Sequence, residues 1–106
     1  MFCASAHAVS CEQLESEAPL RGAHIMGYQS GHTAVGKGRV QFYSGPTEKC
    51  KMPGVFILPG QTVNGYIRYR GFTSVMYLNP KTGEDTTGWV RSTRLQFNGT
   101  GIAPKQ

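Results

Sequence analysis

The fold is decided by residues 71–95, which read GFTSVMYLNPKTGEDTTGWVRSTRL. An apolar and aromatic run over 72–78 is followed by a polar cluster over 79–84 and by a second short run, Gly88-Trp89-Val90. Asn-Pro opens turns, Gly83 adopts a positive φ without steric cost, and both runs are rich in residues that favour pleated backbone. The stretch therefore predicts a β-hairpin and excludes a helix.

Alternating apolar residues predict further strands upstream of this hairpin. Val40 and Phe42 share one face of a strand that ends at Ser44-Gly45-Pro46, residues 55–58 form a short apolar strand, and residues 62–69 alternate again. Gly65 is a candidate for the bend that a small barrel requires. We expect an all-β barrel of five antiparallel strands over residues 37–97, with these side chains inside: Val40, Phe42, Val55, Ile57, Val63, Ile67, Val75 and Val90.

Three motifs in this region resemble those of bacterial SH3-like domains. Residues 88–95, GWVRSTRL, are similar to the end of those domains, where a strand leads through a short helical turn into the last strand. Residues 38–46, GRVQFYSGP, resemble the first strand and turn, and residues 58–63, LPGQTV, the step into the second strand. The resemblance implies a small, partly open β-barrel. Members of that family are wall-binding modules, scaffolds and inhibitors more often than enzymes, and the fold alone does not choose among them.

The chain of 106 residues is long enough for one domain with a modest core. Residues 9–36 predict an N-terminal arm: residues 10–18 favour a helix, but Pro19 and Gly22 limit it to about two turns. Residues 20–36, rich in small and polar side chains, predict a loop or an added edge strand. We expect residues 98–106 to form a flexible tail.

Residues 1–8 predict the remnant of a secretory signal peptide, because Ala6-His7-Ala8 matches an Ala-x-Ala cleavage pattern. Cleavage there would remove Cys3 and leave Cys11 and Cys50 as an even pair in the periplasm or outside the cell, where a disulfide is expected. Two alternatives stay open: a poor lipobox would place a lipid on Cys11, or the cysteines are reduced in a cytosolic protein. No apolar run approaches the length of a membrane span.

Candidate catalytic and metal-binding groups are sparse. Cys50 with His24 or His32 has the residue types of a thiol nucleophile and its base, but wall peptidases of that kind keep their chemistry in a separate domain. The two histidines have no carboxylate or thiol neighbour at ligand spacing. We therefore expect no enzyme activity, no metal and no cofactor.

Positive charge is concentrated in the predicted barrel. Residues 9–36 hold one Arg against three Glu, whereas residues 37–106 hold ten Lys and Arg against three acids, which is 10 − 3 = +7. This excess favours an acidic protein face, an anionic wall polymer or nucleic acid, unless it serves solubility alone. Small barrels do bind single-stranded nucleic acid, but the signal remnant and cysteine pair argue against that partner.

Arginine beside aromatic side chains is the composition of interface hot spots. Arg68 and Arg70 are two residues apart and are expected to share a strand face with Tyr66. The predicted partner-binding residues are Arg68, Arg70, Tyr66, Tyr43, Tyr77 and Trp89, with the barrel core as the alternative place for Trp89.

Two functions fit this set of features. The first is a stand-alone exported binding protein, an immunity protein or inhibitor that neutralises a toxin or hydrolase with an acidic surface. The second is a wall-targeting module that recognises peptidoglycan peptides. A targeting module normally carries a cargo domain, for which this chain has no room, so the first function is favoured.

Overall fold

The computed structural model describes residues 10–100, which form one curled antiparallel sheet. Seven of its eight strands follow the order β4-β3-β7-β6-β5-β2-β8, and the eighth, β1, pairs with β5. Their bounds are Ala23–His24 (β1), Gly31–Ala34 (β2), Val40–Tyr43 (β3), Lys51–Ile57 (β4), Thr62–Tyr69 (β5), Phe72–Leu78 (β6), Asp85–Arg91 (β7) and Leu95–Phe97 (β8).

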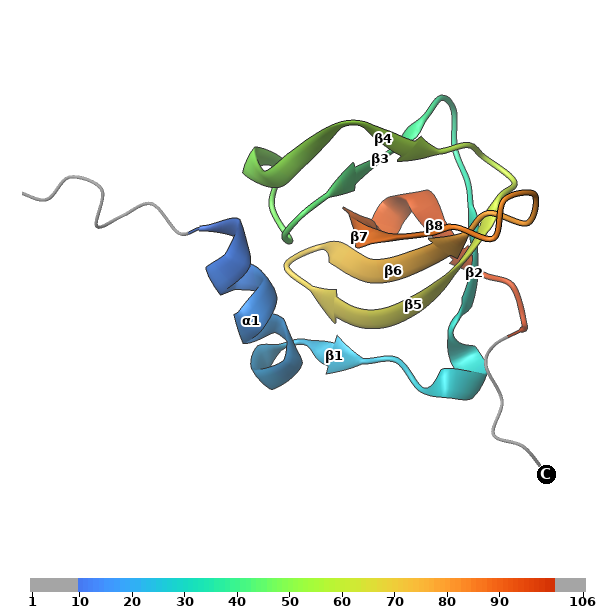
Figure 1. The fold of residues 1–106 in the computed structure, drawn as a ribbon. Coiled ribbons are helices and arrows are strands. Elements are labelled where there is room, and N and C mark those ends of the chain that lie inside the picture. The colour runs from blue at the N-terminus through green and yellow to red at the C-terminus, as the bar shows by residue number, and fades with distance from the viewer. Residues whose placement is uncertain (1–9, 101–106) are drawn as a thin grey trace, which may run out of the picture.

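The described residues also form one α-helix, α1 (Cys11–Arg21), and three 3-10 turns, η2 (Gly27–Gln29), η3 (Glu48–Cys50) and η4 (Ser92–Arg94). Figure 1 shows the sheet curling into a partly open barrel, with α1 beside one end of β5 and β6. The predicted partly open all-β barrel with a short N-terminal helix is therefore confirmed, but residues 37–97 contain six strands, β3 to β8, where five were predicted. The predicted signal remnant, residues 1–8, lies outside the described residues.

The β6–β7 hairpin forms where the sequence predicts it, with continuous pairing from Phe72↔Arg91 to Leu78↔Asp85. Asn79 opens the turn, because its Oδ1 accepts the backbone N–H of Lys81 at 2.8 Å. Gly83 closes it with a φ of 79° and donates its N–H to the Asn79 carbonyl at 2.8 Å. The turn thus uses the asparagine and the glycine for the reasons that predicted it.

A β-bulge in β5 changes which of its residues face the barrel core. The pairing with β6 skips Tyr66, so the register shifts between Gly65 and Ile67. One extra residue exchanges the two faces of a strand. Val63 therefore belongs to the barrel core, whereas Ile67 packs against a second cluster on the other face of the sheet. The prediction that Ile67 lies inside the barrel is wrong, because simple alternation does not continue across a bulge.

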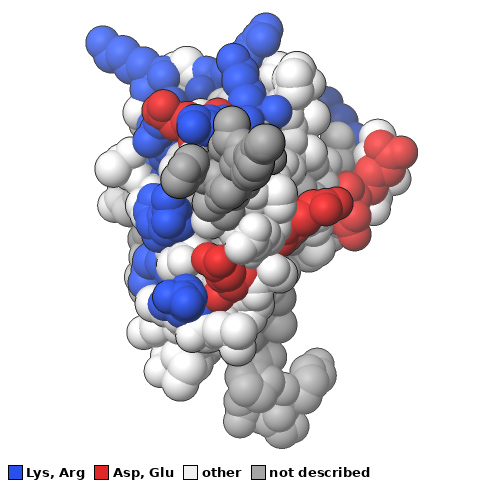
Figure 2. All heavy atoms as spheres, turned by 90° about the vertical axis from the view of Figure 1, so that its left-hand side faces the viewer, with Lys and Arg blue, Asp and Glu red and all other residues white. Residues whose placement is uncertain are grey.

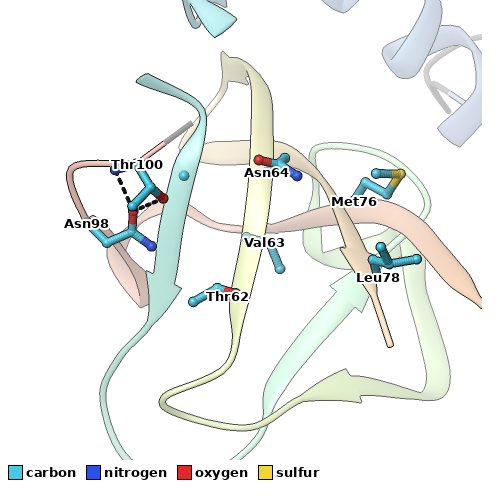
Figure 3. A pocket seen from close by; sticks show the side chains of 8 residues that line it. Thr62, Val63, Asn64, Met76, Leu78, Asn98 and Thr100 are labelled. Carbon is cyan, nitrogen blue, oxygen red and sulfur yellow. Dashed lines mark hydrogen bonds between the residues drawn. The ribbon is translucent and has the colours of Figure 1, made fainter. Parts of the chain in front are cut away.

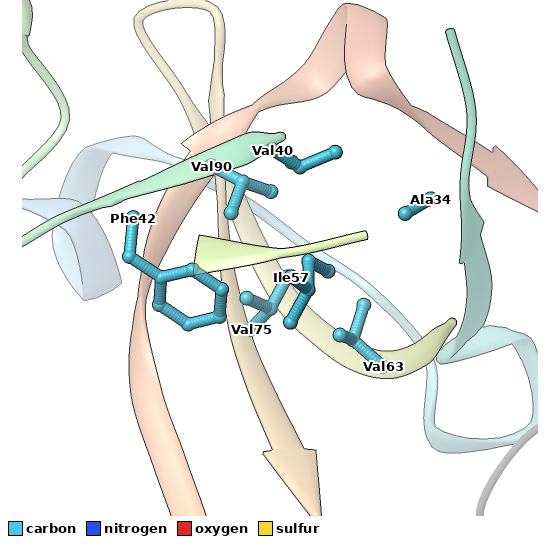
Figure 4. Packing of buried hydrophobic residues seen from close by; sticks show 7 residues of the cluster. All are labelled: Ala34, Val40, Phe42, Ile57, Val63, Val75 and Val90. Carbon is cyan, nitrogen blue, oxygen red and sulfur yellow. The ribbon is translucent and has the colours of Figure 1, made fainter. Parts of the chain in front are cut away.

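Small aliphatic side chains around one phenylalanine fill the barrel. Figure 4 shows them converging between the strands of the curled sheet. Val55, predicted to be inside, is only partly buried and packs against this cluster, because it lies on the edge strand β4. The buried members are Ala34, Val40, Phe42, Ile57, Val63, Val75 and Val90.

The helix α1 covers the outer face of the sheet at one end. Ser10 caps it by accepting the Gln13 N–H at 3.0 Å. Its buried residues are Leu14 and Ala18, and Ala18 joins Phe72 and Trp89 in the second buried cluster. The helix has 11 residues and so exceeds the predicted two turns. Burial against the sheet offsets the hydrogen bond that Pro19 removes.

Cys11 and Cys50 lie at disulfide distance, with their Cα atoms 5.8 Å apart. This pairing agrees with the predicted disulfide, and it ties the start of α1 to η3, in the connection between β3 and β4. Two further contacts hold the other end of the helix: the Tyr69 hydroxyl donates to Glu17 at 3.3 Å, and His24 Nε2 lies 2.7 Å from the Pro19 carbonyl oxygen.

The predicted arm contributes to the sheet itself. β2 lies between β5 and β8 instead of at an edge, so the predicted barrel boundary at residue 37 leaves out one of its strands. A four-residue strand of small and polar residues carries too little alternation to be recognised. Residues 98–100, predicted to begin a flexible tail, bond to this strand: Gly31 N–H donates to the Thr100 carbonyl at 2.9 Å. Residues 101–106 lie outside the described part of the chain.

Arg94, in η4, holds the loop between β2 and β3. Its Nε donates to the Val35 carbonyl at 2.7 Å, and one Nη donates to the carbonyls of Lys37 and Gly38 at 3.0 and 2.8 Å. The other Nη lies 3.2 Å from the Arg39 carbonyl. A planar fork with five donors is suited to several carbonyls at once, so this arginine is a structural residue.

We expect Arg94→Lys to lower the free energy of unfolding by about 1–3 kcal/mol, because one ammonium group cannot reach all four carbonyls and charge-assisted bonds are lost. Urea unfolding measures the difference. Arg21→Lys, an exposed change at the end of α1, is the matched control and should leave stability within about 0.5 kcal/mol. Equal stability of both variants and the wild type would show that the loop does not depend on this guanidinium.

Candidate functional site

Basic side chains gather at the end of the molecule where α1 lies. Figure 2 looks onto this end, and Lys and Arg occupy the left and upper part of the view, with most Asp and Glu toward the right. Acidic residues of α1 include Glu12, Glu15 and Glu17. The charge separation predicted from the sequence thus appears on one face of the folded molecule.

A surface pocket of about 360 Å³ lies in this basic region. We call it the Arg91 pocket. It combines the loop from Pro46 to Lys49 with the β5–β6 turn and the adjoining ends of β6 and β7. Its lining residues are Pro46, Thr47, Glu48, Lys49, Arg70, Phe72 and Arg91.

The local structure places Arg91 firmly in this pocket. Arg91 and Phe72 are directly opposite in the β6–β7 pairing, and the guanidinium carbon lies 5.1 Å from the centre of the Phe72 ring. Tyr43 supports that ring from the side, edge-on, with ring centres 5.0 Å apart. Cation–π contact and strand pairing together restrict the guanidinium more than a free surface arginine is restricted.

Glu48 of η3 forms an ion pair with Arg91. The Glu48 side chain is 72% exposed and that of Arg91 39% exposed. Lys49 and Arg70 add two further cations to the pocket lining, so three cations face one carboxylate. The pocket therefore keeps a positive excess after its internal ion pair is counted.

Arg70, one of the predicted binding residues, lines this pocket, and Tyr43 supports its Phe72 wall. β5 ends at Tyr69, and Arg70 has a φ of 57° in a two-residue turn with Gly71, whose φ is 83°. The grouping of Arg70 with Arg68 assumed that strand alternation continues to residue 70. Because Arg70 lies in the turn, alternation does not set the direction of its side chain.

The other predicted binding residues lie elsewhere. Arg68 is exposed and pairs with Ala23 of β1, and Tyr66 is the bulge residue, 37% exposed. Tyr77 is partly buried against the barrel core, and its hydroxyl accepts the Gln61 amide N–H at 3.0 Å. Trp89 is 1% exposed, so it belongs to the core under α1, the alternative that the sequence left open, and offers no surface to a partner.

A second hollow of about 260 Å³ is lined by residues of β2, β5, β6 and the segment after β8 (Figure 3). Several of its polar groups are bonded within the protein. Asn98 Oδ1 accepts from the Thr100 hydroxyl at 2.6 Å and its amide donates to Thr33 at 3.1 Å, while Asn64 Oδ1 accepts from Ser30 at 3.1 Å. These bonds join β2 and β5 to the segment after β8, which is a structural task.

The predicted thiol and imidazole groups are committed to structural contacts. Cys50 is paired with Cys11, and His32 is buried with its Nδ1 2.7 Å from the Ser30 carbonyl oxygen. Among residues 10–100, no three His, Cys, Asp or Glu side chains are grouped to hold a metal ion. In the same residues, no helix is long and apolar enough to cross a membrane.

The chain was compared with three sets of known proteins, and none gave a match. This holds for protein-family models, for curated proteins and for solved structures. The resemblance to bacterial SH3-like domains therefore stays a prediction that rests on the three motifs.

Sequence reasoning missed Arg91, Glu48 and Lys49. Arg91 follows Trp89 at the same two-residue spacing that drew attention to Arg68 and Arg70, so its place on the Trp89 face was predictable from β7 alone. Its meeting with Glu48 was not, because that contact joins residues 43 positions apart (91 − 48 = 43).

Proposed function

We propose that this protein is a non-catalytic binding protein, exported to the periplasm or outside the cell, that neutralises a toxin or hydrolase by docking on its acidic surface. The observation that carries the proposal is the Arg91 pocket with its surplus of cations. Electrostatic complementarity of this kind speeds association with an acidic partner and selects against basic ones.

Two further features support this function. The Cys11–Cys50 pair, at disulfide distance, suits an oxidising compartment. Aromatic and apolar side chains stand beside the cations, with Phe72 and Pro46 in the pocket and Tyr43 behind it. Such contacts keep their value when salt screens the charges, as hot spots of protein interfaces require.

Peptidoglycan binding is the second candidate, because a basic surface also attracts an anionic wall polymer. An uncharged peptide or sugar would be expected in a hollow with free polar groups. In the hollow beside β5, the Asn98 amide nitrogen and the Asn64 amide oxygen are already bonded within the protein, which favours the protein partner.

Charge reversal at Lys49 and Arg70, two exposed cations of the Arg91 pocket, tests the proposal. The double variant Lys49→Glu, Arg70→Glu is expected to weaken binding of the captured partner more than tenfold at low salt and less at high salt, mainly through slower association. Melting should change little, because exposed charges contribute little to stability. The measurement is capture from periplasmic extract or with the product of the adjacent gene, followed by binding kinetics at two salt concentrations.

The control is Lys37→Glu, Lys81→Glu, which alters net charge by the same amount in other loops. Equal weakening by both double variants would mean that net charge alone matters. Retention by purified peptidoglycan, with no protein captured, would replace the proposed function by the wall-binding one.

A further inference from the structure

In the Arg91 pocket, the protein already binds one carboxylate, its own Glu48. Glu48 Oε2 pairs with one Nη of Arg91, while the guanidinium lies over the Phe72 ring. The acceptor comes from the short turn η3, and the donor comes from the end of a central strand. The cation is thus fixed by the sheet, and the carboxylate is attached to a surface loop.

The Glu48–Arg91 pair is easily exchanged. At 72% exposure Glu48 gains little from the contact, because water screens the attraction and holding a long side chain in one geometry costs entropy. When an incoming carboxylate binds Arg91, the displaced Glu48 side chain returns to water. Its hydration then replaces the ion pair that was broken.

The rest of the pocket is suited to a second carboxylate better than to a bare inorganic ion. Lys49 and Arg70 supply positive charge that Glu48 alone does not balance, and Pro46 and Phe72 supply an apolar wall for a methylene stem. A volume of about 360 Å³ accommodates an acidic side chain together with neighbouring backbone.

We propose that the Arg91 pocket receives an aspartate or glutamate side chain of the acidic protein partner, which replaces Glu48 on Arg91. This inference rests on the proposed function and names the contact through which the protein would bind its partner. Glu48 is then an internal competitor that the partner displaces.

The test uses a blocked hexaglutamate peptide as the probe, titrated into the full-length protein at low salt and followed by amide and arginine Nε–H chemical shifts. The wild type should show saturable shifts at Arg91, Arg70 and Phe72. Glu48→Gln should bind the peptide about two- to fivefold tighter, because the exposed competitor is removed. Arg91→Gln should bind at least tenfold more weakly, because a charge-assisted donor is lost.

Matched controls separate this contact from general electrostatics. Glu84→Gln removes the same charge at the other end of the β6–β7 hairpin, and Lys81→Gln removes a cation there. Both should change peptide affinity less than twofold. Thermal unfolding of every variant shows whether it is folded, and Glu48→Gln tests the idea even if Arg91→Gln does not fold.

Several results would overturn the inference: no binding to the wild type, no gain for Glu48→Gln over Glu84→Gln, or equal affinity for inorganic phosphate and the peptide. Its failure is separable from that of the proposed function. A captured partner that binds wild type, Glu48→Gln and Arg91→Gln alike refutes the exchange and leaves the function standing. If the peptide binds the variants as expected but no partner protein is captured, the result counts against the proposed function and not against the exchange at Arg91.

Discussion

Phe42→Ala is expected to lower the free energy of unfolding by about 3–5 kcal/mol, a large part of the stability of a domain of this size. Phe42 is fully buried at the centre of the barrel cluster, among valines and one isoleucine that are small and β-branched. Stiff side chains on paired strands cannot collapse into the space that the ring leaves. Urea unfolding followed by Trp89 fluorescence measures the loss.

Phe56→Ala is the matched control for this prediction. Phe56 is partly buried on the neighbouring strand β4, where the Arg39 guanidinium lies 4.2 Å from its ring centre. The same truncation at this edge position should cost less than half as much, since water fills the space. Equal losses at both positions would show that Phe42 is not the centre of the core.

Replacing both paired cysteines, Cys11→Ser with Cys50→Ser, is expected to lower the free energy of unfolding by about 4 kcal/mol. The sequence separation of 39 residues sets this value, because the bridge restricts a loop of that length in the unfolded chain. The bridge also anchors η3, so Glu48 and Lys49 are expected to lose their fixed place beside Arg91.

Unfolding curves of the oxidised protein with and without reductant check this value, with Cys3→Ser in both proteins to prevent exchange of partners. Mass measurement after alkylation identifies the bonded pair. Addition of reductant to the double serine variant is the control and should change nothing. Two alkylated thiols in the unreduced protein, or a lipid on Cys11, would contradict the bridge.

The β6–β7 hairpin was predictable because its causes are local. Asn79 and Gly83 act through their own backbone geometry, and the apolar residues of β6 alternate without interruption. The burial of Val75 and Val90 follows directly from that alternation. The pairing of Cys11 with Cys50 was predictable only on the expectation that Cys3 is removed with a signal peptide, which would leave one partner for each remaining cysteine.

The two faces of β5 could not be assigned in the same way. Tyr66 is an extra residue only with respect to the register of β6, so the bulge is a property of the pairing and leaves no mark in the alternation of β5 itself. For this reason simple alternation predicts the wrong face for Ile67 and groups Tyr66 with Arg68. Arg70 departs from the alternation for another reason, because it lies beyond the end of β5 in the turn with Gly71.

The sequence by itself determined the hairpin, the alternating core of β3 and β6, and the basic character of the barrel. Each of these depends on neighbouring residues or on composition. Only the tertiary structure decided that β2 enters the sheet, that Trp89 is covered by α1, and that Glu48, Arg70 and Arg91 line one pocket. The pocket joins a loop, a turn and a strand end that are distant along the chain, and strand order with the bridge to α1 brings them together.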